Sequence, residues 1–272
     1  MLLSTSSVYP ESTTAAFEIA ARLGYDGLEL MVWSDAVSQD AGALQGLIRH
    51  YGVSVGSVHA PCLLVTQRVW SRDPWERLRR AARLAETLGA STVVVHPPFA
   101  WQRDYARGFA EGLSTLTAEH PGIRFAVENM YPLRGIGRVE VVPYSPGWDP
   151  TTAGFDAYTL DVSHCAAAQT DCLGMADAMG ARLAHIHLGD GTGRGRDEHL
   201  VPGRGTQPCA ELLHSLPARG FAGAIALEVT TRRVANRAER EEYLREALEF
   251  TRRHLAVAGE RVRGHGALPA DV

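Results

Sequence analysis

The chain contains no lysine, and all 27 of its Lys and Arg positions are arginine. A lysine amine is needed to form a Schiff base with a carbonyl substrate, to link pyridoxal phosphate and to bind phosphate in a P-loop. The absence of lysine therefore excludes Schiff-base aldolases, pyridoxal enzymes and P-loop proteins. Any polarisation of a carbonyl or phosphate group has to come from arginine, from backbone groups or from a metal ion.

Other features are missing as well. The four cysteines show no CxxC pair and no framework spacing, which indicates reduced and mostly buried thiols. The opening residues, MLLSTSSVYPE, contain no cationic segment and no long apolar run. We therefore expect a cytoplasmic protein with no signal peptide and no membrane span. A net charge of -4 shows no basic footprint for nucleic acid.

Short apolar runs alternate with longer amphipathic runs through the chain. We predict strands at Leu2–Thr5, Gly27–Val32, Val53–Val58, Thr92–Val95, Arg124–Val127, Tyr158–Leu160, Leu183–Leu188 and Ala224–Leu227. We predict helices at Ser12–Leu23, Ala41–Tyr51, Pro74–Leu88, Asp104–Glu119, Asp171–Met179, Pro208–Arg219 and Arg237–Leu255. This alternation, at this length, favours an α/β protein with a single (β/α)₈ barrel, or TIM barrel, over residues 1–258. A doubly wound sheet is the alternative, but it needs a glycine-rich turn after the first strand, and Ser4–Val8 lacks one.

Two segments depart from the alternation. Residues 130–155, after the fifth strand, form a long stretch rich in proline and aromatic residues, which is typical of a lid or binding loop. We expect the fifth helix to be short or missing there. Residues 259–272 carry several glycines and Pro269, and we expect a flexible tail without a function.

Side chains that can bind metal ions recur at the carboxyl ends of the predicted strands, where (β/α)₈ barrels build their active sites. They are Glu29, His59, His96, Glu128, Asp161, His187 and Glu228, with His164 just after Asp161 and with Asp197 and His199 in the glycine-rich loop after His187. Imidazole nitrogen and carboxylate oxygen are ligands for metals such as zinc. A single such residue is more often a core histidine or a helix cap, but the recurrence at successive strand ends predicts a metal centre.

Three further residues have weaker claims. Arg204, between two glycines, could bind a substrate phosphate or carboxylate, and a solvated turn arginine is the alternative. Trp101 follows the fourth strand and could line the pocket, with ordinary packing as the alternative. His185 shares its strand with His187, and we predict that it faces outward toward the helices as a core residue.

The strand-end motifs resemble those of the xylose isomerase-like barrel superfamily. They are HAP at His59, HPP at His96, VEN at Glu128, DVSH at Asp161 to His164, HIHLGD around His187, DEHLVPGRG at Asp197 to Gly205 and LEV at Glu228. The similarity extends over residues 2–255. This superfamily contains sugar-phosphate isomerases and epimerases, and also apurinic endonucleases of the endonuclease IV type.

The resemblance implies two ligand sets. In the epimerase branch, the matching single-metal set is Glu128, Asp161, His187 and Glu228, and its two glutamates also serve as acid and base. In the endonuclease branch, the matching three-zinc set is His59, His96, Glu128, Asp161, His164, His187, Asp197, His199 and Glu228, and all nine are present. The implied cofactor is one to three divalent ions, zinc or manganese. The candidate substrate-binding residues are Arg204, Trp101 and His164.

The chain departs from the endonuclease pattern in two places. The loop after the second strand, MVWSDAVSQD, carries Asp35 and Asp40 where that family has a basic and aromatic DNA-contacting loop, and ENMYP follows the fifth strand instead of the family's sequence. We therefore expect a small carbohydrate-like substrate and no nucleic acid. Relatives in the superfamily are often dimers or tetramers, so the resemblance also implies a homo-oligomer.

The predicted function is that of a metal-dependent isomerase or epimerase acting through an enediolate on a small polyhydroxy carbonyl compound or its phosphate. A dehydratase or lyase would use the same intermediate. The alternative from the endonuclease branch is a multi-metal phosphodiesterase with Glu128 as the bridging ligand. A third alternative is a barrel that only binds a ligand or partner.

Overall fold

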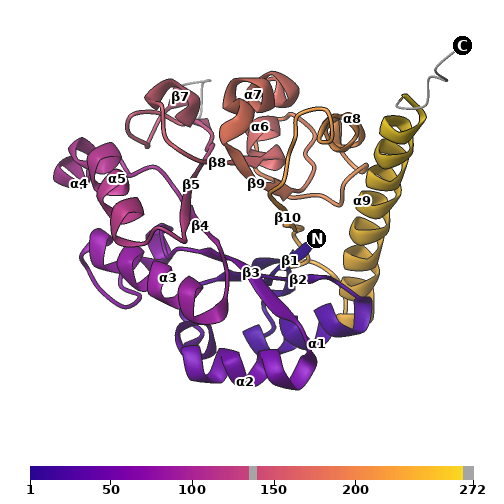
Figure 1. Ribbon diagram of the computed structural model, residues 1–272, viewed down its shortest axis with the longest axis horizontal. Helices are drawn as coiled ribbons and strands as arrows, with labels where there is room; N and C mark the ends of the chain where they lie inside the picture. The colour runs from indigo at the N-terminus through magenta and orange to yellow at the C-terminus, as the bar shows by residue number, and fades with distance from the viewer. Residues whose placement is uncertain (135–139, 266–272) are drawn as a thin grey trace, which may run out of the picture.

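The computed structural model describes residues 1–134 and 140–265, and these contain a closed barrel of eight parallel strands (Figure 1). The strands are β1 (Leu2–Ser4), β2 (Gly27–Met31), β3 (Ser54–His59), β4 (Thr92–Val95), β5 (Arg124–Glu128), β8 (Tyr158–Asp161), β9 (Leu183–Leu188) and β10 (Ala224–Leu227). Their order around the barrel is β1-β10-β9-β8-β5-β4-β3-β2, and β1 closes the ring by pairing with both β10 and β2. The predicted (β/α)₈ barrel is confirmed.

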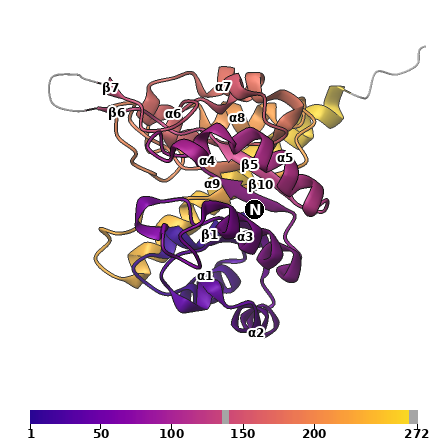
Figure 2. The same ribbon diagram turned by 90° about the vertical axis from the view of Figure 1, so that its left-hand side faces the viewer.

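Helices surround the barrel (Figures 1 and 2). They are α1 (Thr13–Leu23), α2 (Ala41–Tyr51), α3 (Pro74–Leu88), α4 (Arg103–Arg107), α5 (Phe109–Glu119), α6 (Val162–Ala168), α7 (Cys172–Met179), α8 (Cys209–Ser215) and α9 (Arg237–His265). Short 3₁₀ helices lie at η1 (Thr5–Val8), η2 (Ala36–Gln39), η3 (Leu64–Thr66), η5 (Pro150–Ala153) and η6 (Gly180–Arg182).

The strands are buried on both faces, as their apolar sequences predict. All four residues of β4 (TVVV) are buried, because one face of each strand packs inside the barrel and the other packs against the helices. The main core cluster includes Val93 and Val95 of β4 together with Phe17 of α1 and Leu78 of α3. Burying each such large apolar side chain contributes about 1.5–3 kcal/mol.

Several helices, α1, α2 and α3 among them, begin and end within a residue of the predicted positions. Asp40 caps α2 by accepting a hydrogen bond from the Ala43 backbone N–H at 3.0 Å, and Asp73 does the same at α3 for Trp75. Gly52 and Gly89 follow these two helices with φ of 68° and 77°. Glycine adopts this left-handed conformation without the steric cost that a Cβ atom would add, so it ends the helix there.

Several elements differ from the prediction. The helix expected at Asp104–Glu119 is divided at Gly108 into α4 and α5, and α6 precedes the helix expected at Asp171–Met179. Between β5 and β8, as expected, the described residues form no α-helix; they contain instead the antiparallel pair β6 (Leu133–Arg134) and β7 (Glu140–Val141), which was not predicted, and η5. At the other end of the chain, α9 continues through residues 259–265, and residues 266–272 of the expected tail lie outside the described residues.

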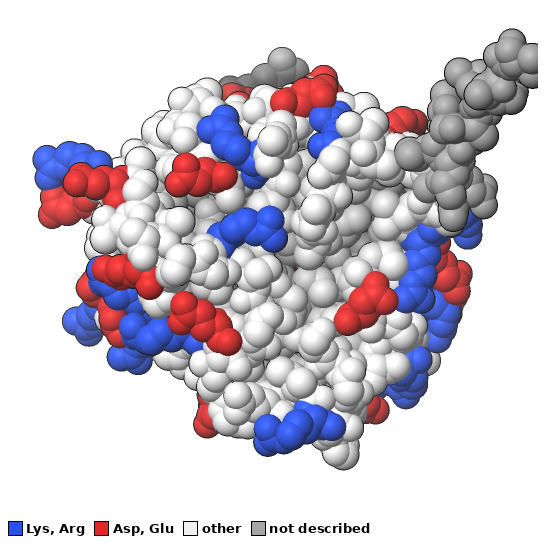
Figure 3. Space-filling model, in the orientation of Figure 1, with Lys and Arg blue, Asp and Glu red and all other residues white. Residues whose placement is uncertain are grey.

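On the face shown in Figure 3, arginine side chains and carboxylates lie next to one another and do not form a large patch of one sign. Within residues 1–134 and 140–265, none of the helices combines the length and apolar character needed to cross a bilayer.

Two glycines provide a matched test of the packing. A Cβ atom on Gly223, at the start of β10, would lie 2.1 Å from the Ala184 carbonyl oxygen of the neighbouring β9. We expect Gly223→Ala to lower the free energy of unfolding by about 1–3 kcal/mol, because the two strands would have to separate. Gly46→Ala in α2, where a Cβ meets nothing within 4 Å, should raise it by about 0.5–1 kcal/mol. Urea unfolding measures both, and equal midpoints would contradict this account of the β9–β10 contact.

Candidate active site

The structure brings the nine predicted ligand residues together at the carboxyl end of the barrel. His59, Glu128 and Asp161 are the last residues of β3, β5 and β8, and His187 lies near the end of β9. His96 and Glu228 come directly after β4 and β10, His164 lies in α6, and Asp197 and His199 belong to the loop after β9. Parallel strands with aligned ends account for this convergence of residues from distant parts of the chain.

Glu128 occupies the centre, with one carboxylate oxygen directed to each of two groups. Its Oε1 lies 3.1 Å from Nδ1 of His187 and 3.3 Å from Nδ1 of His164. Its Oε2 lies 3.0 Å from Nε2 of His96 and 3.4 Å from Nε2 of His59. The side chain is only 1% exposed, so it joins the two groups inside the protein.

The first group surrounds His187. Besides Glu128, the Nδ1 atom of His187 lies 3.2 Å from Oε2 of Glu228 and 3.5 Å from Oδ2 of Asp161. Ser6 donates a hydrogen bond to the other oxygen of Glu228, at 2.9 Å. Without Ser6, this group is the four-residue set that the resemblance to the epimerase branch implies: Glu128, Asp161, His187 and Glu228.

The second group is formed by His59 and His96, whose Nε2 atoms are 3.1 Å apart. A third group lies toward the loop after β9. There Asp197 has Oδ1 at 3.0 Å from Nε2 of His199 and Oδ2 at 3.6 Å from Nε2 of His164.

The spacing of these atoms fits bound metal ions. Two ligand atoms on one tetrahedral zinc, each about 2.0–2.2 Å from the metal, lie roughly 3.3–3.6 Å apart. The distances around His187 and around Oε2 of Glu128, 3.0–3.5 Å, overlap that range and extend slightly below it. Oε2 of Glu128 and Oδ2 of Asp161 are, moreover, buried atoms without a hydrogen-bond partner among the described residues. Because unpartnered buried carboxylate oxygens are costly, their chemistry fits a divalent cation.

The electrostatics of the site rest on imidazole and carboxylate groups facing one another. Burial raises the pKa of Glu128, but His187 and His96 outweigh burial and hold this pKa well below its usual range. Burial lowers the pKa of His164, but the carboxylates of Asp161 and Asp197 outweigh burial and raise this pKa to about 10. The pKa of His96, by contrast, stays below its usual value because burial dominates. At neutral pH the Glu128 carboxylate is therefore ionised. Neighbouring imidazolium groups balance its charge, and a bound metal ion would take over that role by displacing their protons.

The loop that carries Asp197 and His199 is held by a residue that the sequence analysis missed. Asp190, fully buried at the start of the loop, accepts backbone hydrogen bonds from four residues at 2.7–3.0 Å: Gly191, Gly203, Gly205 and Gln207. Ser163 of α6 donates to Asp197 at 2.8 Å. His199 has a left-handed φ of 45°, which a residue with a Cβ atom adopts only when its surroundings hold it there. The sequence did contain a signal for this role of Asp190: it lies between two glycines in HLGDG, and further glycines follow in PGRG.

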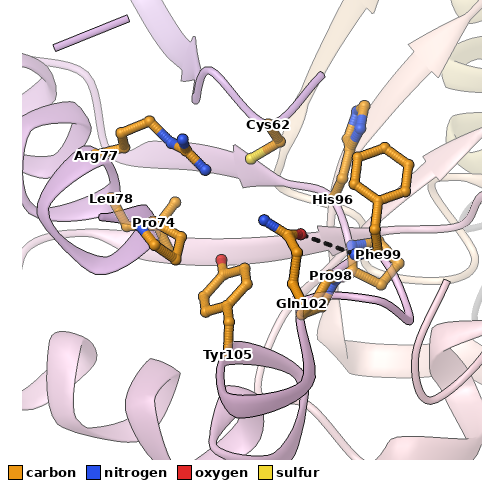
Figure 4. Close-up of a pocket in the computed structure, with 10 residues that line it drawn as sticks. Cys62, Pro74, Arg77, Leu78, His96, Pro98, Phe99, Gln102 and Tyr105 are labelled. Atoms are coloured by element: carbon orange, nitrogen blue, oxygen red, sulfur yellow. Dashed lines mark hydrogen bonds between the residues drawn. The ribbon is translucent and has the colours of Figure 1, made fainter. Parts of the chain in front are cut away.

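A cavity of 680 Å³ opens above the ligand residues, large enough for a small-molecule substrate. Its walls include Trp33, Tyr131 and Tyr144, and three arginines line it as well: Arg196, Arg232 and Arg233. Sequence analysis did not single out these arginines, because nothing in a local motif shows that their loops meet. A second cavity, of 10 Å³, lies behind His96 beside Cys62, Arg77 and Tyr105 (Figure 4), and has room for about one water molecule.

The structure does not bring Arg204 and Trp101 into the larger cavity. The Arg204 guanidinium pairs with Glu246 of α9 and lies over the Tyr243 ring. Trp101 is 56% exposed and stacks on Phe99. His164, the third predicted substrate-binding residue, does line the cavity.

The prediction that His185 faces outward toward the helices is wrong. His185 and His187 are two residues apart on β9, and side chains two apart on a strand lie on the same face. Both therefore point into the barrel, where Nε2 of His185 lies 2.7 Å from Oε2 of Glu29. Glu29, a strand residue left out of the predicted ligand sets, is itself fully buried.

The fold and the site are those of a (β/α)₈ barrel whose polar centre lies at the carboxyl ends of its strands. Residues 17–254 match the xylose isomerase-like TIM barrel family, and the chain belongs to this family. An uncharacterized protein of Mycobacterium tuberculosis is 51% identical over 271 residues, which cover 93% of this chain and 96% of the relative. Fructoselysine 3-epimerase of Escherichia coli O157:H7 is 24% identical, covering 86% of this chain and 90% of that protein.

Solved structures show the same fold. A D-tagatose 3-epimerase-like protein superposes with a TM-score of 0.70 at 23% identity, covering 96% of this chain and 98% of that one. L-ribulose 3-epimerase superposes with a TM-score of 0.69 at 17% identity, covering 100% and 99%.

The geometry predicts different metal contents for two variants. Glu128 joins two ligand groups, so we expect Glu128→Gln to lose most bound metal and all turnover. His199 belongs only to the third group, which lies toward the loop after β9. His199→Ala should therefore leave metal content unchanged in a one-metal protein and remove one ion in a multi-metal protein. Elemental analysis of the purified wild-type and variant proteins gives the number directly. If Glu128→Gln kept its full metal content and full activity, Glu128 would not be the central ligand of the site.

Proposed function

We propose that this protein is a divalent-metal-dependent isomerase or epimerase that acts through an enediolate on a small polyhydroxy carbonyl compound. The observation that carries the proposal is the meeting of Glu128, Asp161, His187 and Glu228 at the carboxyl end of the barrel, where Glu128 and Glu228 line the 680 Å³ cavity. The names of similar proteins support it: fructoselysine 3-epimerase in sequence, and D-tagatose 3-epimerase-like protein and L-ribulose 3-epimerase in structure.

The chemistry requires removal of a proton from a carbon next to a carbonyl group and its return. A divalent ion held by these four residues would stabilise the negative charge that develops on adjacent substrate oxygens. Glu128 and Glu228 both line the cavity, and we assign them the roles of general base and general acid. Ser6 and His187 hold the two oxygens of Glu228 at 2.9 and 3.2 Å, which orients the carboxylate toward substrate. Zinc and manganese both suit a nitrogen and oxygen ligand set.

The substrate, in this proposal, carries an anionic group such as a phosphate or carboxylate. Arg196, Arg232 and Arg233 line the cavity, and none forms an ion pair with a described residue within 4.0 Å. Arg232 lies over the ring of Tyr9 at 4.7 Å, which holds the guanidinium near the mouth. The planar guanidinium fork matches phosphate and carboxylate oxygens, whereas a neutral sugar needs no such group.

A specific observation favours a second function, that of a multi-metal phosphodiesterase. All nine residues of the larger ligand set are within the site, and Glu128 directs one oxygen to each of two groups. Two ions about 3.5–4 Å apart can hold the attacking and leaving oxygens of a phosphodiester. Incubation with a duplex that contains an abasic site, in the presence of zinc or manganese, tests this alternative, and an intact duplex would exclude its DNA version.

Solvent exchange tests the proposed chemistry even when the product is unidentified. In deuterium oxide with zinc or manganese, we expect deuterium to enter a ketose at the carbon next to the carbonyl group, because the removed proton mixes with solvent. Mass spectrometry of a panel of ketoses and their phosphates detects the exchange. Chelator-treated protein should lose the exchange and regain it when metal is added. The absence of exchange across the panel would count against an enediolate.

The arginine side chains predict which members of that panel react best. Replacing both Arg232 and Arg233 by glutamine should raise KM for an anionic substrate by about 10-fold or more, since each charged hydrogen bond contributes about 1.5–3 kcal/mol. The kcat value should change less, because these groups lie at the mouth and not at the reacting carbons. Arg204→Gln is the matched control, since Arg204 pairs with Glu246 outside the cavity. An unchanged KM in the double variant would remove the anionic group from the proposal.

A further inference from the structure

Glu29 is a fully buried carboxylate that the proposed chemistry does not use. It is the third residue of β2, and its Oε2 accepts hydrogen bonds from Ser57 Oγ at 2.9 Å and from His185 Nε2 at 2.7 Å. Its Oε1 lies 2.9 Å from Nε2 of His187. In the barrel, β2 is separated from β9 by β1 and β10, so these contacts with His185 and His187 cross the interior.

The two ring nitrogens of His187 face different surroundings. Nδ1 faces the carboxylates of Glu128, Asp161 and Glu228 at 3.1–3.5 Å, and Nε2 faces Glu29 alone. A metal ion binds the nitrogen that carries no hydrogen, and a neutral imidazole has one of each kind. A carboxylate can only accept a hydrogen bond, so Glu29 selects the form with the hydrogen on Nε2. The lone pair is then on Nδ1, on the side of the other ligands.

Glu29, His185 and His187 do not themselves have the spacing of a second metal site. The 2.7 Å between Oε2 of Glu29 and Nε2 of His185 is a hydrogen-bond distance, shorter than the roughly 3.3–3.6 Å between ligands on one tetrahedral ion. A hydrogen atom, and not a metal ion, therefore lies between these two atoms.

We propose that Glu29 is a positioning residue that fixes the orientation and hydrogen placement of His187, with Ser57 and His185 holding Glu29 in turn. This inference rests on the metal part of the proposed function. Ser57 and His185 both occupy Oε2, which leaves Oε1 for His187. Oε1 of Glu29 and Nε2 of His187 are both buried, and neither forms a hydrogen bond of ordinary geometry with a described residue, the other included. At 2.9 Å they face each other as an ion pair, and the proposal requires that this contact becomes a hydrogen bond when His187 binds a metal ion through Nδ1. Carboxylates behind a metal-binding histidine also increase its basicity as a ligand.

Glu29→Gln tests the proposal with little change in shape. An amide has one accepting oxygen, and if Ser57 and His185 take it, the NH₂ group faces His187 and favours a hydrogen on the wrong ring nitrogen. We expect the dissociation constant for zinc or manganese to rise about 10- to 100-fold. Competition with a chromophoric chelator, using protein stripped of metal, measures this constant without any substrate. Urea unfolding of the same stripped proteins shows whether stability has changed separately.

Thr159→Val is the matched control. Thr159 pairs with His185 across the β8–β9 ladder and is fully buried, but it makes no hydrogen bond to Glu29 or His187. Its metal dissociation constant should stay within about twofold of the wild-type value, because Thr159 forms no hydrogen bond that orients Glu29 or His187. A folded Glu29→Gln protein with wild-type metal affinity would overturn the proposal, as would an equal loss in Thr159→Val.

His185→Phe provides a second variant that keeps Glu29 itself. It removes one of the two groups that hold Glu29 while preserving a ring of similar size, and we expect weaker metal binding than in the wild type, by less than in Glu29→Gln. If Glu29→Gln does not fold, unchanged metal affinity in His185→Phe overturns the proposal. Failure of the proposed function looks different, because in that case the wild-type protein would itself bind no metal.

Discussion

The site depends on the balance of charge inside a barrel that excludes water. Glu29, Glu128 and Asp161 are each no more than 1% exposed, and an isolated carboxylate at such depth would cost several kcal/mol. Neighbouring imidazole groups reduce this cost. Burial alone would raise the pKa of Glu29 and of Glu128, but these histidines hold both pKa values below the usual range. Because each charge needs its partners, the positions of these side chains are strongly coupled, and they form one unit.

The barrel supplies the geometry that makes this balance workable. Strand ends that are distant in sequence meet at one mouth, and the side-chain layers inside the barrel place His187 above His185 and opposite Glu29. The loop after β9 extends the unit outward, since Asp190 gathers its backbone N–H groups and Ser163 ties it to α6. A glycine-rich loop thereby becomes a fixed support for Asp197 and His199, and the strain at His199 indicates how firmly it is held.

The candidate site has an inner and an outer part that share Glu128. The inner group around His187 contains the carboxylates of Glu128, Asp161 and Glu228. Of the outer residues, His59 and His96 also contact Glu128, and Asp197 and His199 lie beyond His164. In the proposed function the inner group performs the proton transfer, and ions held by the outer residues would be needed only for the phosphodiesterase alternative. The mouth of the cavity carries three arginines above these carboxylates and histidines.

Local sequence determined the elements and the candidate ligand residues. Alternating apolar patterns, acidic helix caps and terminal glycines located most helices and strands within a few residues, because these signals act between neighbours in the chain. The strand-end motifs named all nine candidate ligands. The hairpin in the long segment after β5 could not be predicted, since strands of two residues leave no periodic signal.

Tertiary structure decided the contacts across the barrel. The sequence shows His185 and His187 close together, but only closure of the sheet puts Glu29 next to both. It shows many arginines, but only the folded loops reveal that Arg196, Arg232 and Arg233 line the cavity while Arg204 binds Glu246 on α9. Residue type and spacing along the chain decide which chemistry is available, whereas distance between remote segments is set by the packing of the whole chain.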